Sequence, residues 1–194
     1  WVHLTIGLLL NAVGTLLMLL ANSWLTFMMS PAGVDAGGVF NGEIWDAMHN
    51  FLWNPINLHR FVANIAYGGS IIGAYAAYKF LSARTPQEKA HYDWMGYNAN
   101  FVAIAGLLPL PFAGYYLVAE IYAYSQQMGI TLMGGIFAWL FIIQAVLIGT
   151  LFLSANYYLW CGMGRSDGAK RYTKYIKYIA IVLVGAFLVG FTPH

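Results

Sequence analysis

Long apolar runs alternate with short polar segments along this chain. Each run is near or above the roughly 20 residues that a helix needs to cross a 30 Å hydrocarbon core. Because the runs are continuous and do not alternate with a period of two residues, they favour membrane helices over a barrel of strands. The pattern predicts an all-α polytopic membrane bundle that forms a single domain over residues 1–194. Its expected spans are about five, at residues 3–29, 56–81, 95–119, 132–159 and 174–191.

A weaker helical pattern lies between the first two predicted spans. Pro31 and Gly33 are loop signals, and apolar residues then recur at helical spacing over residues 39–53. This predicts a short amphipathic helix on the outer membrane surface. Asn54 and Pro55 follow and predict the start of the next helix, with asparagine as its N-cap and proline in its first turn.

The third predicted span contains Pro109 and Pro111. Proline has no backbone N–H and clashes with the preceding turn, so the helix is expected to kink or break there. Such breaks at membrane depth are tolerated where the helix is buried in protein or lines a cavity. A short outer loop is expected to follow, at about residues 120–131.

The composition agrees with a membrane protein and excludes several other classes. Sixty per cent of the residues are hydrophobic and 8% are charged, whereas soluble domains carry about 25% charged residues. A nucleic-acid-binding surface needs clustered Lys and Arg, and a disulfide framework needs more than the single Cys161. The sequence also lacks the motifs for covalent heme c, nucleotide binding and zinc hydrolysis.

The basic residues orient the predicted spans. Of nine Lys and Arg, eight lie in the segments between spans two and three and between spans four and five or in the span ends that border them, and only Arg60 lies near the other side. Cytoplasmic loops carry the excess of basic residues, which predicts a cytoplasmic N-terminus and an outer C-terminus at His194. The expected location is a prokaryotic inner (cytoplasmic) membrane.

A histidine inside a membrane helix is a functional candidate. His59 lies one turn into the second predicted span, beside Arg60. A neutral imidazole is a ligand for heme b iron, and Arg60 is placed to neutralise a heme propionate. Met133, which opens the fourth predicted span, is the best second ligand, and Met128 is a weaker candidate. The alternatives are an interfacial histidine bonded to a loop carbonyl and methionines that only fill the core.

Two outer stretches together resemble subunit I of the cytochrome bd quinol oxidases. They are Asn22-Ser23-Trp24 followed by Met29-Ser30-Pro31-Ala32-Gly33, and Asn54-Pro55 followed by Phe61. The resemblance covers about residues 5–82 and continues as a general pattern through spans three and four. It implies a subunit whose low-spin heme b takes electrons from quinol at the outer face, with a histidine and a methionine as ligands.

The family's ligands transfer unequally to this chain. Met133, followed by two glycines, resembles the family's methionine motif. Anchored on Asn54-Pro55, the family's histidine falls at Ala63, and His59 lies one helical turn, about 5.4 Å, further out. Either the heme sits one turn higher or the ligand has been lost. The family's heme d ligand and proton-path acids have no counterpart, so the resemblance implies an electron-transfer module and not a complete oxygen reductase.

The sequence therefore predicts a membrane electron-transfer subunit that binds heme b and exchanges electrons with quinol near the outer face. Glu120 is the acid placed to accept a quinol proton, and an exposed interfacial carboxylate is the alternative interpretation. The expected partners are the lipid bilayer, other membrane subunits of a redox complex and a periplasmic cytochrome, without nucleic acid. The alternative is a heme-free anchoring subunit of a larger respiratory or photosynthetic complex. A transporter has only the broken third span in its favour.

Overall fold

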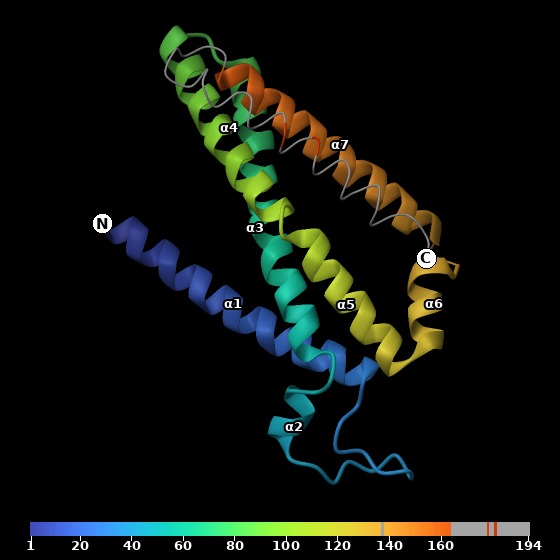
Figure 1. Ribbon diagram of the computed structural model, residues 1–194. Helices are drawn as coiled ribbons and strands as arrows, with labels where there is room; N and C mark the ends of the chain where they lie inside the picture. Colours follow the sequence, from blue (N-terminus) through green and yellow to red (C-terminus); the bar gives the residue numbers. More distant parts are fainter. Residues whose placement is uncertain (137, 164–177, 179–180, 182–194) are drawn as a thin grey trace. The chain divides into compact units, whose positions relative to one another are not determined.

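The computed structural model describes residues 1–136, 138–163, 178 and 181, and every regular element in that part is an α-helix (Figure 1). The predicted all-α class is confirmed. The helices are, in chain order, α1 (Val2–Met29), α2 (Ile44–Met48), α3 (Trp53–Ser82), α4 (Pro86–Leu107), α5 (Leu110–Tyr124), α6 (Gln126–Gly134) and α7 (Ala138–Met163).

Three stretches of the described residues are long and apolar enough to cross a membrane. They are α1, the run formed by α4 and α5 (Pro86–Tyr124), and α7 over Ala138–Gly162. Helices of this length and composition indicate a membrane protein in contact with a lipid bilayer. The second predicted span, 56–81, is helical within α3, but α3 is not one of the three apolar stretches. The fifth, 174–191, lies outside the described residues, so the count of five spans stays a prediction.

The surface helix predicted over residues 39–53 is shorter in the structure. Helix α2 has only 5 residues, because turns hold the preceding segment in a loop. The Asp35 carboxylate accepts hydrogen bonds from the backbone N–H groups of Gly37 and Val39, both at 2.9 Å. Gly33 has a φ of +72°, and a Cβ there would lie 2.9 Å from the Gly42 Cα. Only glycine tolerates both the left-handed backbone and this close approach.

The two prolines break the third predicted span, as expected. Helix α4 ends at Leu107 and α5 begins at Leu110. The Leu108 N–H still donates to the Ile104 carbonyl at 3.0 Å, but Pro109 and Pro111 have no N–H to continue the ladder. The predicted break is confirmed.

The outer loop and the fourth span begin differently from the prediction. Residues 126–134 form α6 instead of a loop, and the Ser125 hydroxyl caps it by accepting from the Met128 N–H at 3.3 Å. Met133 therefore belongs to α6, and the long helix α7 starts only at Ala138. The start of α3 also differs: the helix already begins at Trp53, so Asn54 lies inside its first turn and is not its N-cap.

The chain divides into two compact units, and each is described by itself. The first comprises Trp1–Arg60 and Tyr116–Gly129, and the second comprises Phe61–Tyr115 and Ile130–His194. Among the described residues of the second unit, α3, α4 and α7 share an apolar core formed by Ala66, Ile104, Leu107, Phe152, Ala155 and Leu159. Tyr158 on α7 donates its hydroxyl proton to the Asp93 carboxylate at 2.7 Å, which ties α7 to α4.

Small residues set the distance between α3 and α4 in the second unit. A Cβ added to Gly69 would lie 2.6 Å from the Ala103 nitrogen and 2.8 Å from the Ala99 oxygen. These neighbours are backbone atoms in a helix, which cannot give way cheaply. Close approach of this kind is the ordinary way in which membrane helices gain packing energy.

We expect Gly69→Ala to destabilise the second unit by about 1–3 kcal/mol, since the added methyl forces α3 and α4 apart. Gly68→Ala is the matched control, because a Cβ at Gly68 meets nothing within 4 Å. The control is expected to be neutral or to stabilise by up to about 1 kcal/mol, through higher helix propensity. Thermal unfolding of the full chain in detergent, followed by circular dichroism, measures both. Equal melting curves for the two variants would contradict the close packing.

Candidate functional site

The predicted chemical residues of the second span lie on the first two turns of α3, inside the first unit. Asn57 is buried, His59 is half-buried and the Arg60 side chain is exposed. The segment before them is anchored by its own packing, since Leu52 and Pro55 are fully buried. This part of α3 is therefore a fixed platform for His59 and Arg60.

A buried amide on α1 holds that platform. Asn22 is 0% exposed, and its Nδ2 donates to the Asn57 Oδ1 at 2.7 Å. Its Oδ1 accepts a hydrogen bond from the Arg60 Nη1. Asn57 in turn donates through its Nδ2 to the Trp53 carbonyl at 2.8 Å. Arg60 is thus oriented by a buried group, and the guanidinium has further N–H donors beyond the one that Asn22 accepts.

A second amide, Asn50, ties the segment between α1 and α3 to the end of α1. This segment, residues 30–52, contains α2 and is called the surface segment below. Asn50 donates through its Nδ2 to the Ala47 carbonyl at 2.9 Å and to the Ser23 carbonyl at 3.4 Å. Its Oδ1 accepts from the Ser30 hydroxyl at 3.1 Å. Asn50 and Ser30 are 4% and 1% exposed, so the bonds of Asn50 to Ser23 and Ser30 are shielded from water. Helix α2 is therefore fixed against the end of α1 although it is only 5 residues long.

His59 is left unsatisfied beside this network. Its Nδ1 is buried and, among the residues that the structure describes, is the single buried side-chain nitrogen or oxygen without a hydrogen-bond partner. Each imidazole nitrogen is a donor, an acceptor or a metal ligand, and leaving a buried one unpaired costs about 1–3 kcal/mol. This unpaired nitrogen sets His59 apart from the other buried polar side chains that the structure describes.

His49 shows the contrast. Its Nδ1 lies 3.0 Å from the Trp45 carbonyl, and its ring contacts those of Trp45 and Trp53 in tilted arrangements, with centroid distances of 4.0 and 4.4 Å. These contacts account for His49 as an aromatic spacer between α2 and α3. His59 is the histidine that the local structure does not explain.

The other predicted site residues are divided between the two units. Glu120 lies half-buried on α5, and Met128 lies half-buried on α6, both in the first unit with His59 and Arg60. Met133 is half-buried and belongs to the second unit. The predicted pair of His59 and Met133 thus stays a prediction.

The glycines after Met133 have different surroundings. A Cβ at Gly135 would lie 2.5 Å from the Thr131 carbonyl oxygen, so the tight end of α6 by itself requires a glycine there. A Cβ at Gly134 would meet nothing within 4 Å. Only Gly134 is therefore open to a flat ligand approaching the backbone.

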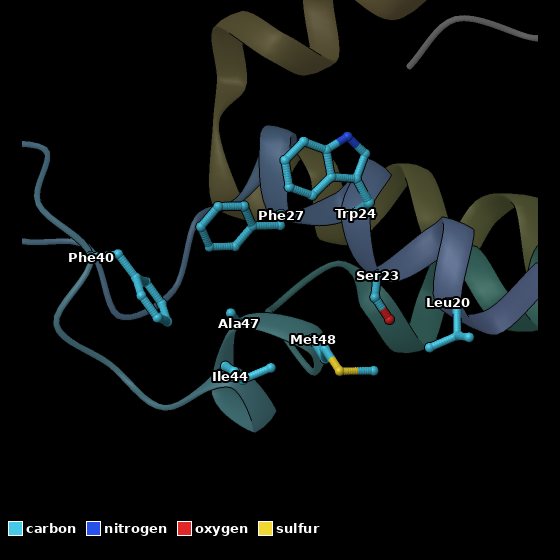
Figure 2. A pocket seen from close by; sticks show the side chains of 8 residues that line it. All are labelled: Leu20, Ser23, Trp24, Phe27, Phe40, Ile44, Ala47 and Met48. Carbon is cyan, nitrogen blue, oxygen red and sulfur yellow. The ribbon is translucent and has the colours of Figure 1, made fainter.

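An apolar groove of about 390 Å³ lies between the end of α1 and the surface segment of the first unit (Figure 2). In Figure 2, Trp24 and Phe27 of α1 stand over Ile44 and Met48 of α2, and Phe40 closes one end. Its remaining lining residues are Leu20, Ser23 and Ala47. The Ser23 hydroxyl already donates to the Leu19 carbonyl at 2.9 Å. The groove therefore presents apolar surface to an occupant, and the hydroxyl proton of Ser23 is already used in a hydrogen bond.

The hydrogen-bonding centres Asn22 and Asn50 were not predicted as site residues. The available signal was the recurrence of short polar side chains, Asn22, Thr26 and Ser30, at intervals of four residues along an otherwise apolar helix end. That spacing places them on one face. All three are buried.

Comparison of the chain with protein-family models, with curated proteins and with solved structures gives no match. Its likeness to the bd oxidases therefore stays a prediction that rests on the sequence stretches 22–33 and 54–61.

We expect Asn22→Leu to destabilise the chain by at least about 1–3 kcal/mol, because it leaves the buried Asn57 oxygen without its donor. Asn11→Leu on the same helix is the matched control, since Asn11 is exposed and its amide bonds only to the Gly7 carbonyl of its own helix. Its effect should be about 0.5 kcal/mol or less. Thermal unfolding in detergent compares the two. If Asn22→Leu melts like the control, the amide pair is not what holds α3 to α1.

Proposed function

We propose that this chain is a membrane electron-transfer subunit that binds heme b through His59 and exchanges electrons with quinol near the outer membrane surface. The proposal rests chiefly on the buried and unpaired His59 Nδ1. A histidine that only packed at the interface would direct this nitrogen to a carbonyl, as His49 does. The proposal also draws on the likeness to subunit I of the bd quinol oxidases.

The local residues suit the anionic edge of such a group. Arg60 is exposed next to His59 and is oriented by Asn22. A guanidinium forms bidentate, charge-assisted hydrogen bonds with carboxylates, so Arg60 would hold a heme propionate. The amide pair beneath it fixes the helix turn, which limits the movement of the His59 ring. The heme would supply a one-electron carrier. Of the two methionines that the sequence offers as a second ligand, Met128 lies in the same unit as His59, and Met133 belongs to the other unit.

Two charged groups would take part in quinol oxidation, one at the quinol and one at the electron carrier. Oxidation of a quinol releases protons, and a half-buried carboxylate is a suitable acceptor. Glu120 is such a group on α5, one turn before the end of that helix at Tyr124. In this proposal Glu120 accepts a quinol proton, while Arg60 balances the charge of the electron carrier.

A second candidate is a heme-free anchoring subunit of a larger membrane complex. It is favoured by α1, because none of the apolar window of that helix is buried within the described chain. The position of the family's histidine at Ala63 also agrees with it. In that case His59 would find its partner on another subunit.

A reduced-minus-oxidised optical spectrum of the purified full chain tests the proposal. We expect a b-type α band that is lost in His59→Ala, because the variant removes the imidazole that would hold the heme. His49→Ala is the matched control from the same unit and should keep the band. Absence of any heme band from well-folded wild-type protein would refute heme binding and favour the anchoring subunit. A band that survives His59→Ala would assign the ligand elsewhere.

For Glu120, we expect Glu120→Gln to lower the rate of quinol oxidation by about 10²–10⁴-fold without loss of the heme band, since the amide cannot accept the proton. Stopped-flow reduction of the heme by a short-chain quinol measures the rate. Glu43→Gln is the control, because Glu43 is exposed in the surface segment. Equal rates for the two variants would remove Glu120 from the proposed reaction.

A further inference from the structure

We propose that the apolar groove between α1 and α2 is a binding site for one acyl chain of a membrane phospholipid. The claim concerns residues that the proposed electron transfer does not use. It stands whether or not the chain binds heme.

The groove is built before any occupant arrives. One amide, Asn50, bonds to the carbonyls of both Ser23 and Ala47, and these two residues belong to its opposite walls. The distance between the walls is therefore set by hydrogen bonds that are shielded from water. A chain that enters does not have to separate the two helices first, which lowers the cost of binding.

The lining selects the chemistry of the occupant. Seven of its eight side chains are apolar, and the eighth, Ser23, donates its hydroxyl proton to Leu19. A polar ligand or a polar peptide would lose its hydrogen bonds to water, and among the side chains of the lining only the Trp24 indole N–H would be left to donate a new one. A saturated hydrocarbon chain loses nothing of this kind.

The groove is also continuous with a surface that faces lipid. It begins at Leu20 on α1, next to Leu16 and Leu17, which are 60% and 61% exposed. Because α1 has the length and composition of a membrane span, its exposed apolar side chains meet acyl chains directly. A lipid therefore reaches the groove by sliding along α1, without leaving the bilayer. Trp24 at the rim is 67% exposed, as suits an indole at the membrane interface.

Photolabelling of the full chain in phosphatidylcholine vesicles tests this site. A trace of phosphatidylcholine carries a diazirine midway along one acyl chain, and peptide mass spectrometry locates the adducts after illumination. We expect adducts concentrated on Phe27, Ile44 and Met48, above the level on Leu9 and Leu16, which lie outside the groove. Labelling spread over α1 in proportion to exposure would overturn the proposal.

A variant that fills the groove supplies the second measurement. Ala47→Trp should lower labelling of Phe27 and Met48 by about threefold or more, because the indole takes the volume of the chain. Leu17→Trp adds the same side chain to α1 outside the lining and should leave that labelling unchanged. Equal labelling in both variants would overturn the proposal. If Ala47→Trp does not fold, the adduct map of the wild-type chain decides alone.

Competition distinguishes the source of the apolar chain. Long-chain quinone added to the vesicles, at a constant fraction of labelled phosphatidylcholine, should leave the groove adducts unchanged. Displacement by quinone alone would assign the groove to an isoprenoid tail and overturn the phospholipid assignment. Adducts that join two polypeptides at Met48 would assign it to a protein partner and likewise overturn it.

Discussion

The first unit depends on one buried amide. Asn22 lies on α1, which is long and apolar enough to span a membrane, and its polar side chain is 0% exposed. An asparagine in such a place is tolerable only when both ends of its amide are bonded, because nothing in hydrocarbon replaces a missing partner. Asn57 and Arg60 supply those partners. The requirement runs in both directions: a shift of this part of α3 by one residue would separate Asn57 and Arg60 from the Asn22 amide. The amide therefore fixes the register of α3 on α1 more sharply than apolar contacts could.

The same logic explains how a helix of 5 residues keeps its place. Isolated helices of this length are unstable in water, since nucleation costs more than one turn returns. The position of α2 is instead fixed by Asn50, whose amide donates to a carbonyl of α1 and to a carbonyl of α2. His49 adds an aromatic spacer between Trp45 and Trp53. The hydrogen bonds of Asn50 thus hold α2 at a fixed distance from α1 and leave the apolar groove between them open. Hydrophobic packing alone would close this groove.

The sequence was a good guide where one local rule decides the structure. The apolar run of α1 and the break at Pro109 and Pro111 follow from hydropathy and from the missing N–H, and both are found. Helix α6 was missed because its nine residues are too short for a periodic signal, and its start depends on the Ser125 hydroxyl. The periodicity over residues 39–53 predicts too long a surface helix. It carries no information on the turn at Asp35, which keeps the backbone in a loop. His59 was found by its chemistry, but its supporting amide was not, since the partners of Asn22 lie 35 and 38 residues away in sequence.

Among the described residues, the buried polar atoms near His59 are hydrogen-bonded, whereas its own Nδ1 is not. Around it, amides and hydroxyls on two helices are paired with short hydrogen bonds, so the local structure is able to satisfy buried polar atoms. Sequences that agree with their fold at every other level tend to break local rules at functional positions. A histidine placed one turn from a complete network, with its Nδ1 buried and unpaired among the described residues, is such a break. The cost of about 1–3 kcal/mol is recovered only when the nitrogen gains a partner, which ties the stability of this turn of α3 to whatever occupies the site.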